Sequence, residues 1–470
     1  MLFNSLEYLV FLPVAWVLFW SVPRHRVAVL LVASYVFYAS WSVPYAAMVF
    51  ALVVVNYLFG LALGRASRHR RSLLAVFIAF DLGVLGVFKY FDFALASFTA
   101  GLRFALGLEL DPPLLRLVLP LGISFFTFEF IHYLIDIYRG SLPVHSFSKF
   151  HVFAAFFPTQ IAGPIKRFQQ FVPSLVSLGH FDSAFAMEGL GLIGRGLAKK
   201  VILADRLAPW ANRGFSAATD GSIGTSDAWL ATLAFSLQIF FDFSGYTDIA
   251  RGSAALFGFR IPINFDGPYL ATSLADFWHR WHISLSTWLR DYVYIPLGGS
   301  RRPQLGVVRN LIVTMLLGGL WHGAAWHFVA WGGFWGVGLA LHHVVRARVT
   351  LPRSRPVLVA GWAFTQIFVL FAWVLFRADS FDAAGVMLRA MVGQGRPSTI
   401  LTAKDLLFIG GTAVALLIAT GLARSGWTLR APVPRGRLRP VVYGAATAVV
   451  VLVASVVAPT GREAFIYFQF

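Results

Sequence analysis

Cysteine is absent from this 470-residue chain. Disulfides, cysteine metal ligands and a thiol that carries an acyl group within the chain are therefore excluded. Charge is also scarce, because Asp, Glu, Lys and Arg make up 13% of the residues while hydrophobic residues make up 58%. Such a composition excludes a soluble globular protein and predicts one that crosses a membrane many times.

Apolar runs recur along the whole chain, and at about 20 residues per crossing they predict about eleven transmembrane helices. The runs cover residues 2–22, 27–43, 45–64, 73–91, 114–137, 186–204, 228–250, 308–341, 356–376, 405–423 and 440–458. Two more polar segments, 150–165 and 276–296, predict re-entrant or interfacial helices. We therefore expect an all-α polytopic membrane protein whose helices surround a central tunnel, with residues 1–470 as a single membrane domain.

Basic residues outnumber acidic ones by 39 to 21 and gather in loops. The loop residues are Arg24 and Arg26, then Arg65, Arg68, Arg70 and Arg71, and finally Arg346, Arg348, Arg353 and Arg355. By the positive-inside rule, the loops at 24–26 and 65–71 lie in the cytoplasm. The N-terminus is then predicted on the opposite, extracytoplasmic side. The basic loops would also suit an anionic cytosolic substrate, but membrane topology alone explains their charge. We expect no nucleic-acid partner. The first run has no Lys or Arg before it and no small-residue cleavage site after it, so it predicts a retained anchor.

The segment from 318 to 333, GGLWHGAAWHFVAWGG, places His322 and His327 inside an apolar run. An imidazole there needs partners for its ring nitrogens and is a site hypothesis by default. The alternative is a packed helix whose histidines bond neighbouring carbonyls. Trp321, Trp326 and Trp331 recur every five positions, so their side chains point in different directions from the helix. This spacing predicts that they line a cavity. The many small residues allow another helix or a ligand to approach closely.

The segment from 276 to 296 places His279 and His282 three residues apart, which predicts that both lie on one face of a helix. Its tryptophans, including Trp281, and its charged residues, including Arg290, predict an amphipathic helix that lines a cavity. A metal site completed by His322 or His327 is an alternative. We expect no metal, because the chain offers no cysteine and no obvious carboxylate ligand.

Two further groups of polar residues lie in apolar runs. Glu129, His132 and Asp136 follow one stripe of a helix and predict either a channel wall or interhelical hydrogen bonds. Asp242 begins a second group that continues through Asp248 around a glycine. We expect both groups to shape a site within the catalytic half, residues 120–343, rather than to perform its chemistry.

In order along the chain, six stretches resemble the membrane-bound O-acyltransferase family and, within it, the bacterial alginate O-acetyltransferase branch. They are PLGISFFTFEFIHYLIDIYRG from Pro120, FFPTQIAGPIKRF from Phe156, FFDFSGYTDIA from Phe240, INFDGPYLATSLADFWHRWHISLSTWLRDYVYIPLGG from Ile263, GLWHGAAWHFVAWGG from Gly319 and the terminal FIYFQF. The resemblance implies that His322 is the family's catalytic histidine. It also implies that His282 is the family's second histidine, on the preceding amphipathic segment. His279 and Trp335 depart from the residues more common in that family.

This resemblance also implies a function. We expect His322 to act as a general base in acetyl transfer from a cytosolic thioester, acetyl-CoA, with no permanently bound cofactor. Trp281, Trp321, Trp326, Arg290, Asp242, Glu129 and His279 are candidates for the substrate tunnel. The resemblance further implies a multi-pass protein of the inner membrane, a periplasmic acetyltransferase partner and a polysaccharide such as alginate as final acceptor. Alternatives are D-alanyl transfer to a cell-wall polymer, a proton-coupled secondary transporter, or an anchor for a periplasmic enzyme.

Overall fold

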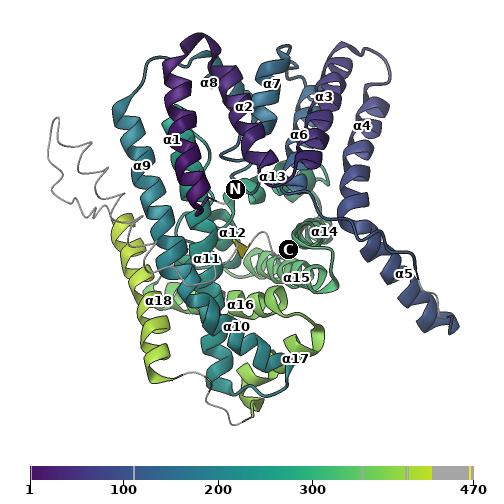
Figure 1. Ribbon diagram of the computed structural model, residues 1–470. Coiled ribbons are helices and arrows are strands. Elements are labelled where there is room, and N and C mark those ends of the chain that lie inside the picture. The colour runs from purple at the N-terminus through teal and green to yellow at the C-terminus, as the bar shows by residue number, and fades with distance from the viewer. Residues whose placement is uncertain are drawn as a thin grey trace. The chain divides into compact units, whose positions relative to one another are not determined.

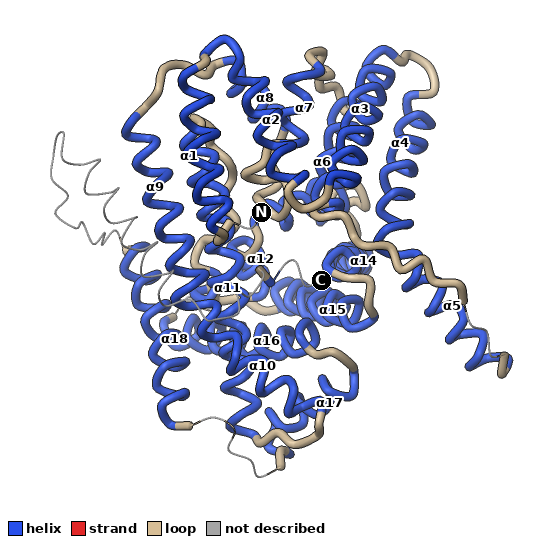
Figure 2. The backbone as a smooth tube through the Cα atoms, viewed as in Figure 1, coloured by secondary structure: helices blue, strands red, loops and turns tan. Residues whose placement is uncertain are grey.

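The computed structural model describes residues 1, 3–108, 112–350, 352, 354–396, 400, 402–425 and 465–466. These residues form helices joined by loops (Figure 2). Among them, Phe265 and Trp281 form one isolated antiparallel bridge. Close contacts divide the chain into two compact units. Unit 1 contains Met1–Ile193 and Ile249–Pro262, and unit 2 contains Gly194–Asp248 and Ile263–Phe470. The predicted all-α class is confirmed.

Unit 1 contains the N-terminal helices (Figure 1). They are α1 (Leu6–Ser21), α2 (Arg26–Ala39), α3 (Val43–Arg65), α4 (Arg70–Leu85), α5 (Phe91–Leu106), α6 (Ile123–Tyr138), α7 (Phe147–Ala155), α8 (Phe168–Val176) and most of α9 (Ser183–Leu197). The chain from 156 to 166 is buried but not helical. The helix predicted over 150–165 therefore ends at Ala155, and the rest of that segment is irregular backbone covered by protein.

Unit 2 contains the segments that carry His282 and His322. Its helices are α10 (Asp205–Thr219), most of α11 (Thr225–Leu256), α12 (Leu274–Arg280), α13 (Ile283–Leu289), α14 (Gln304–His322), α15 (Trp326–Arg348), α16 (Arg355–Arg377), α17 (Phe381–Arg389) and α18 (Ala403–Arg424). A π-helical turn over Ala198–Ala204 precedes α10, and another over Arg290–Tyr294 follows α13. Its core is rich in aromatic side chains, among them Trp331, Trp335 and Trp373.

Seven helices in the described residues are long and apolar enough to cross a bilayer, so this is a polytopic membrane protein. They are α3, the continuous Arg70–Leu106 helix, α11, α14, α15, α16 and α18, while α1 and α2, bent by 109°, form a possible eighth. Run 308–341, predicted as one crossing, is in fact two helices. Run 114–137 is helical only from Ile123, and run 440–458 lies outside the described residues.

Close packing of α14 against α15 positions His322 (Figure 1). His322 is the last residue of α14, and the short turn through Gly323 leads into α15. Glycines allow the two backbones to touch: a Cβ at Gly336 would lie 2.8 Å from Ile312 Cα, and one at Gly332 would overlap the Met315 carbonyl oxygen. The small residues of this segment thus permit the close helix approach that the sequence predicts.

Gly332 gives a direct test of this packing. We expect Gly332→Ala to destabilise the protein by about 1–3 kcal/mol, because the added methyl group would meet a rigid backbone rather than a movable side chain. Gly333→Ala is the matched control, since its Cβ would meet only Leu316 Cδ2 at 3.5 Å. Thermal unfolding in detergent measures both variants. Equal unfolding temperatures for the two would contradict the proposed packing.

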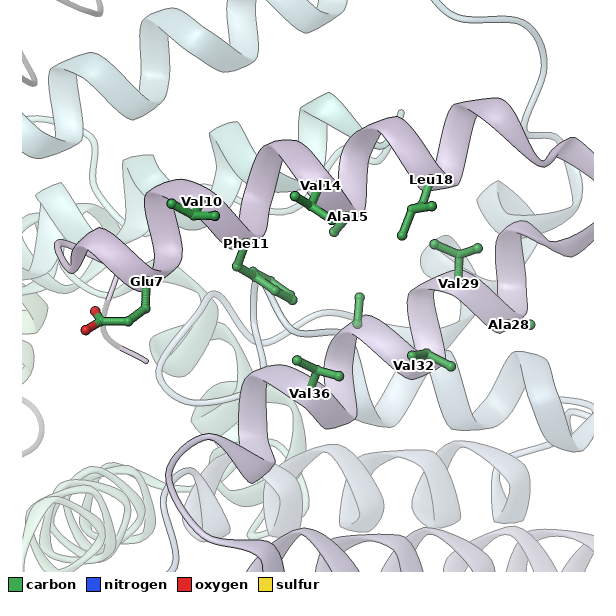
Figure 3. Close-up of a pocket in the computed structure, with 11 residues that line it drawn as sticks. Glu7, Val10, Phe11, Val14, Ala15, Leu18, Ala28, Val29, Val32 and Val36 are labelled. Carbon is green, nitrogen blue, oxygen red and sulfur yellow. The ribbon is translucent and has the colours of Figure 1, made fainter.

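A separate groove of about 540 Å³ lies between α1 and α2 in unit 1 (Figure 3). Aliphatic side chains such as Val10, Val14 and Val32 line it, with Glu7 near one end. The described residues that line it include no histidine. Exposed aliphatic side chains are ordinary where helices face lipid, so we assign no chemistry to it.

Candidate active site

His282 lies at a break between two short helices. α12 ends at Arg280, and His282 adopts a left-handed conformation (φ 43°, ψ 55°) as the N-cap of α13. The prediction that His279 and His282 share one face of a single helix is therefore wrong. Asn264 holds the break in place: its carbonyl accepts the Ile283 N–H at 3.0 Å, and its side-chain oxygen accepts the Ser284 hydroxyl at 2.6 Å.

The His282 side chain is completely buried. Its ring meets the edge of Phe243 at 4.7 Å between centroids and lies 6.0 Å from the Trp321 ring. Burial lowers the pKa of His282 to about 3. Since removal from water disfavours the charged imidazolium, His282 is neutral at physiological pH.

This burial predicts a pH dependence of stability. In the unfolded chain the imidazole regains its ordinary pKa of 6.5, so below pH 6.5 the unfolded state binds more protons than the folded state. The protein must therefore lose stability as pH falls from 6.5 toward 3. We expect the unfolding temperature of His282→Asn to fall less between pH 7 and 4 than that of the wild type, because Asn does not titrate and tolerates left-handed backbone. Parallel curves would contradict this expectation.

His322 is partly exposed at the end of α14. Its ring contacts three aromatic side chains, with centroid distances of 4.9 Å to Trp321, 5.1 Å to Trp331 and 5.2 Å to Phe376. Trp321 is therefore in ring contact with both His282 and His322. His282 is buried and His322 is partly exposed, and both rings contact the Trp321 ring.

The other candidates in unit 2 are not all gathered here. Trp281 is buried and stacks on Phe277 at 5.5 Å, within the same aromatic core. His279, Arg290 and Trp326 are exposed, and Trp326 is 55% accessible. Arg290 pairs with its neighbour Asp291 at 2.9 Å. Exposed side chains at these three positions do not share the buried aromatic surface of His282.

Asp242 belongs to a buried ionic cluster that sequence reasoning missed in part. Lys200 Nζ lies 2.6 Å from Asp242 and 2.8 Å from Asp205, and the second oxygen of Asp242 accepts the Ile466 N–H at 2.8 Å. Lys200 is 1% exposed. A lysine within the apolar run 186–204 was the available signal, because such a charge needs an anionic partner. Of the terminal FIYFQF stretch, only Phe465 and Ile466 are described.

Glu129, His132 and Asp136 lie on α6 in unit 1 and are buried. Lys166 donates to both oxygens of Glu129 at 2.7 and 2.9 Å. Gln169 donates to Asp136 at 2.7 Å, and His132 Nδ1 lies 3.0 Å from the Phe128 carbonyl. These contacts match the hydrogen-bonding interpretation of the stripe. Lys166 was not singled out in the sequence, although its motif was.

Among the described residues, no group of three or more His, Asp or Glu side chains is arranged to hold a metal ion. A neutral imidazole can accept a proton from a hydroxyl or donate a hydrogen bond to an oxygen.

A family model described as MBOAT, the membrane-bound O-acyltransferase family, matches residues 127–380, which include both histidines. A probable alginate O-acetylase of Azotobacter vinelandii is 44% identical over 401 residues, covering 84% of this chain and 79% of that protein. A peptidoglycan O-acetyltransferase of Helicobacter pylori is 37% identical over 77% of this chain and 73% of its own. A teichoic acid D-alanyltransferase of Streptococcus thermophilus is 31% identical over 50% of this chain and 60% of its own. This chain therefore belongs to the membrane-bound O-acyltransferase family and is an acyltransferase.

Proposed function

We propose that the protein moves an acetyl group from acetyl-CoA in the cytosol to an extracytoplasmic acceptor, for O-acetylation of an exopolysaccharide such as alginate. The names of the relatives in Azotobacter vinelandii and Helicobacter pylori support acetyl as the group and a cell-envelope glycan as the acceptor. The observation that carries the proposal is the position of His322, which is partly exposed at a helix end and whose ring contacts those of Trp321, Trp331 and Phe376.

In this mechanism His322 removes the proton from the acceptor hydroxyl. The hydroxyl oxygen then attacks the acyl carbon, the new O–C bond forms, the C–S bond breaks, and the thiolate takes up the proton held by His322. His282 stays neutral and acts as a hydrogen-bond partner that positions a substrate oxygen. The aromatic surface excludes water and so limits hydrolysis of the thioester.

The remaining candidates receive different roles. We assign Trp281 and Trp321 to the wall of the substrate tunnel. Asp242 and Glu129 are held by buried lysines, so we assign them to the support of their helices. His279, Arg290 and Trp326 are exposed, and we assign them contacts at the protein surface rather than with reacting atoms.

We further propose that residues 1–470 act as one inner-membrane domain of about eleven crossings around a tunnel, with the catalytic half at 120–343. The Arg-rich loops support an N-terminus outside the cell. An extracytoplasmic acetyltransferase partner then delivers the group to the polysaccharide. Vectorial transfer of this kind needs one opening toward the cytosolic donor and another toward the acceptor.

Analysis of the cell-envelope glycans tests the function. Cells that lack the gene are compared with cells that carry the wild type or His322→Ala, and ester-linked acetyl and D-alanyl groups are quantified by NMR. We expect only the wild type to restore acetyl esters. Restoration of D-alanyl esters instead would select the alternative that the teichoic acid relatives represent. Full acetylation with His322→Ala would favour a transporter or an anchor.

A further inference from the structure

Three tryptophans form a contiguous group beside His322, and we call Trp278, Trp331 and Trp335 the indole cluster. Trp331 and Trp335 are four residues apart on α15, so they lie on the same face of the helix. Trp278 of α12 contacts both, with ring centroids 6.0 and 5.2 Å away. The ring centroids of Trp331 and His322 lie 5.1 Å apart, so the cluster contacts the proposed base.

The indole N–H groups of the cluster are buried, and no residue that the structure describes accepts a hydrogen bond from them. Trp331 and Trp335 are each 1% exposed. Buried indole N–H groups usually find an acceptor, because leaving a donor unmatched away from water is unfavourable. Three unmatched donors in one cluster therefore indicate that something other than these residues supplies the acceptors.

Apart from His322, the described ring neighbours of the cluster are aromatic side chains. Trp335 stacks on Phe277 at 5.2 Å and meets Phe368 at 4.9 Å, while Trp331 meets Phe376 at 5.3 Å. Close packing of α15 on α14 through Gly332 and Gly336 fixes the helix that bears both indoles. A group of buried donors without acceptors among the described residues has the hydrogen-bonding character that matches a ligand with several carbonyl oxygens.

We propose that the indole cluster binds carbonyl oxygens of the acyl donor and that Trp331 donates to the carbonyl of the transferred group. The proposal deepens the function proposed above and rests on it. When the acceptor oxygen attacks, negative charge develops on that carbonyl oxygen before the C–S bond breaks. The Trp331 N–H stabilises this charge, while His322 holds the proton from the hydroxyl. Trp278 and Trp335 bind further carbonyls along the arm of the donor.

Two analogues of acetyl-CoA test the carbonyl contact without turnover. One is the ketone in which CH₂ replaces the thioester sulfur, and the other is S-ethyl-CoA, which lacks the carbonyl. We expect purified wild-type protein to bind the ketone about 2- to 10-fold more tightly, the effect of one neutral hydrogen bond. Trp331→Phe keeps a ring but removes the N–H, so it should abolish this preference. A wild type that binds both analogues equally would overturn the proposal, even if the variant does not fold.

Turnover supplies the second measurement. We expect Trp331→Phe to lower kcat by about 10²-fold, as loss of one oxyanion donor does, with the unfolding temperature unchanged. Trp16→Phe is the matched control: its indole N–H is also buried without an acceptor among the described residues, but Trp16 lies in unit 1. Wild-type kcat in folded Trp331→Phe would overturn the cluster's role. If the wild type transfers no acetyl group, the proposed function is wrong. The preference for the ketone analogue then still tests whether the indole cluster binds a carbonyl group.

Discussion

We expect His322→Gln to lower the kcat of acyl transfer by about 10²–10⁴-fold, with little change in the unfolding temperature. The loss is expected because Gln keeps a polar side chain of similar reach but is not basic. We propose His322 as the base because it is partly exposed and its ring contacts Trp321 and Trp331. Steady-state transfer from labelled acetyl-CoA by purified protein gives kcat.

His343→Gln is the matched control for this substitution. His343 lies farther along α15, beyond the contacts that surround His322, and we place it outside the catalytic machinery. We expect its kcat to equal that of the wild type. If His322→Gln also keeps wild-type turnover, the assignment of the base is wrong.

Lys200→Met is the change with the largest expected effect on stability. The substitution leaves Asp205 and Asp242 buried without their shared cation, since Lys200 Nζ lies 2.8 and 2.6 Å from them. Removal of one partner from a buried ionic group costs about 3–5 kcal/mol. We therefore expect a large fall in unfolding temperature and in yield. The triple variant Lys200→Met, Asp205→Asn, Asp242→Asn should recover part of the loss, because no unpaired charge remains.

Lys199→Met provides the control at the adjacent position. Lys199 is 22% exposed and pairs with Asp248 at 2.7 Å, but Arg195 also binds that carboxylate at 2.9 Å. Asp248 thus keeps a cation after the change, and the effect should be small. Equal destabilisation by Lys199→Met and Lys200→Met would show that the buried cluster is not what stabilises this part of unit 2.

The helical class and the membrane character follow from the sequence, because long apolar runs are a strong local signal. Histidines in tryptophan-rich apolar segments mark His282 and His322 as site candidates. Their assignment to one site comes from the family resemblance. The split of run 308–341 into α14 and α15 also had a local signal. Gly323 and its small neighbours, next to His322, mark the turn.

The break at His282 was beyond local reasoning. Residues 276–296 have a helical pattern, but Asn264, 20 residues before Ser284, binds the backbone and side chain that follow His282. Lys200 and Asp242 are 42 residues apart, and Lys166 and Glu129 are 37 apart. Spacing along one helix cannot reveal such pairs, because only tertiary packing brings their partners together. The acceptor-free indole cluster likewise appears only once α12 lies against α15.

Labelling in inside-out membrane vesicles tests the central claim most directly. The vesicles come from cells that make wild-type protein or His322→Ala in equal amounts, and labelled acetyl-CoA is added to the exposed cytosolic face. We predict that acetyl label becomes covalently fixed to lumenal acceptors in wild-type vesicles and not in His322→Ala vesicles. Equal lumenal labelling in the two preparations would contradict acyl transfer across the membrane by His322.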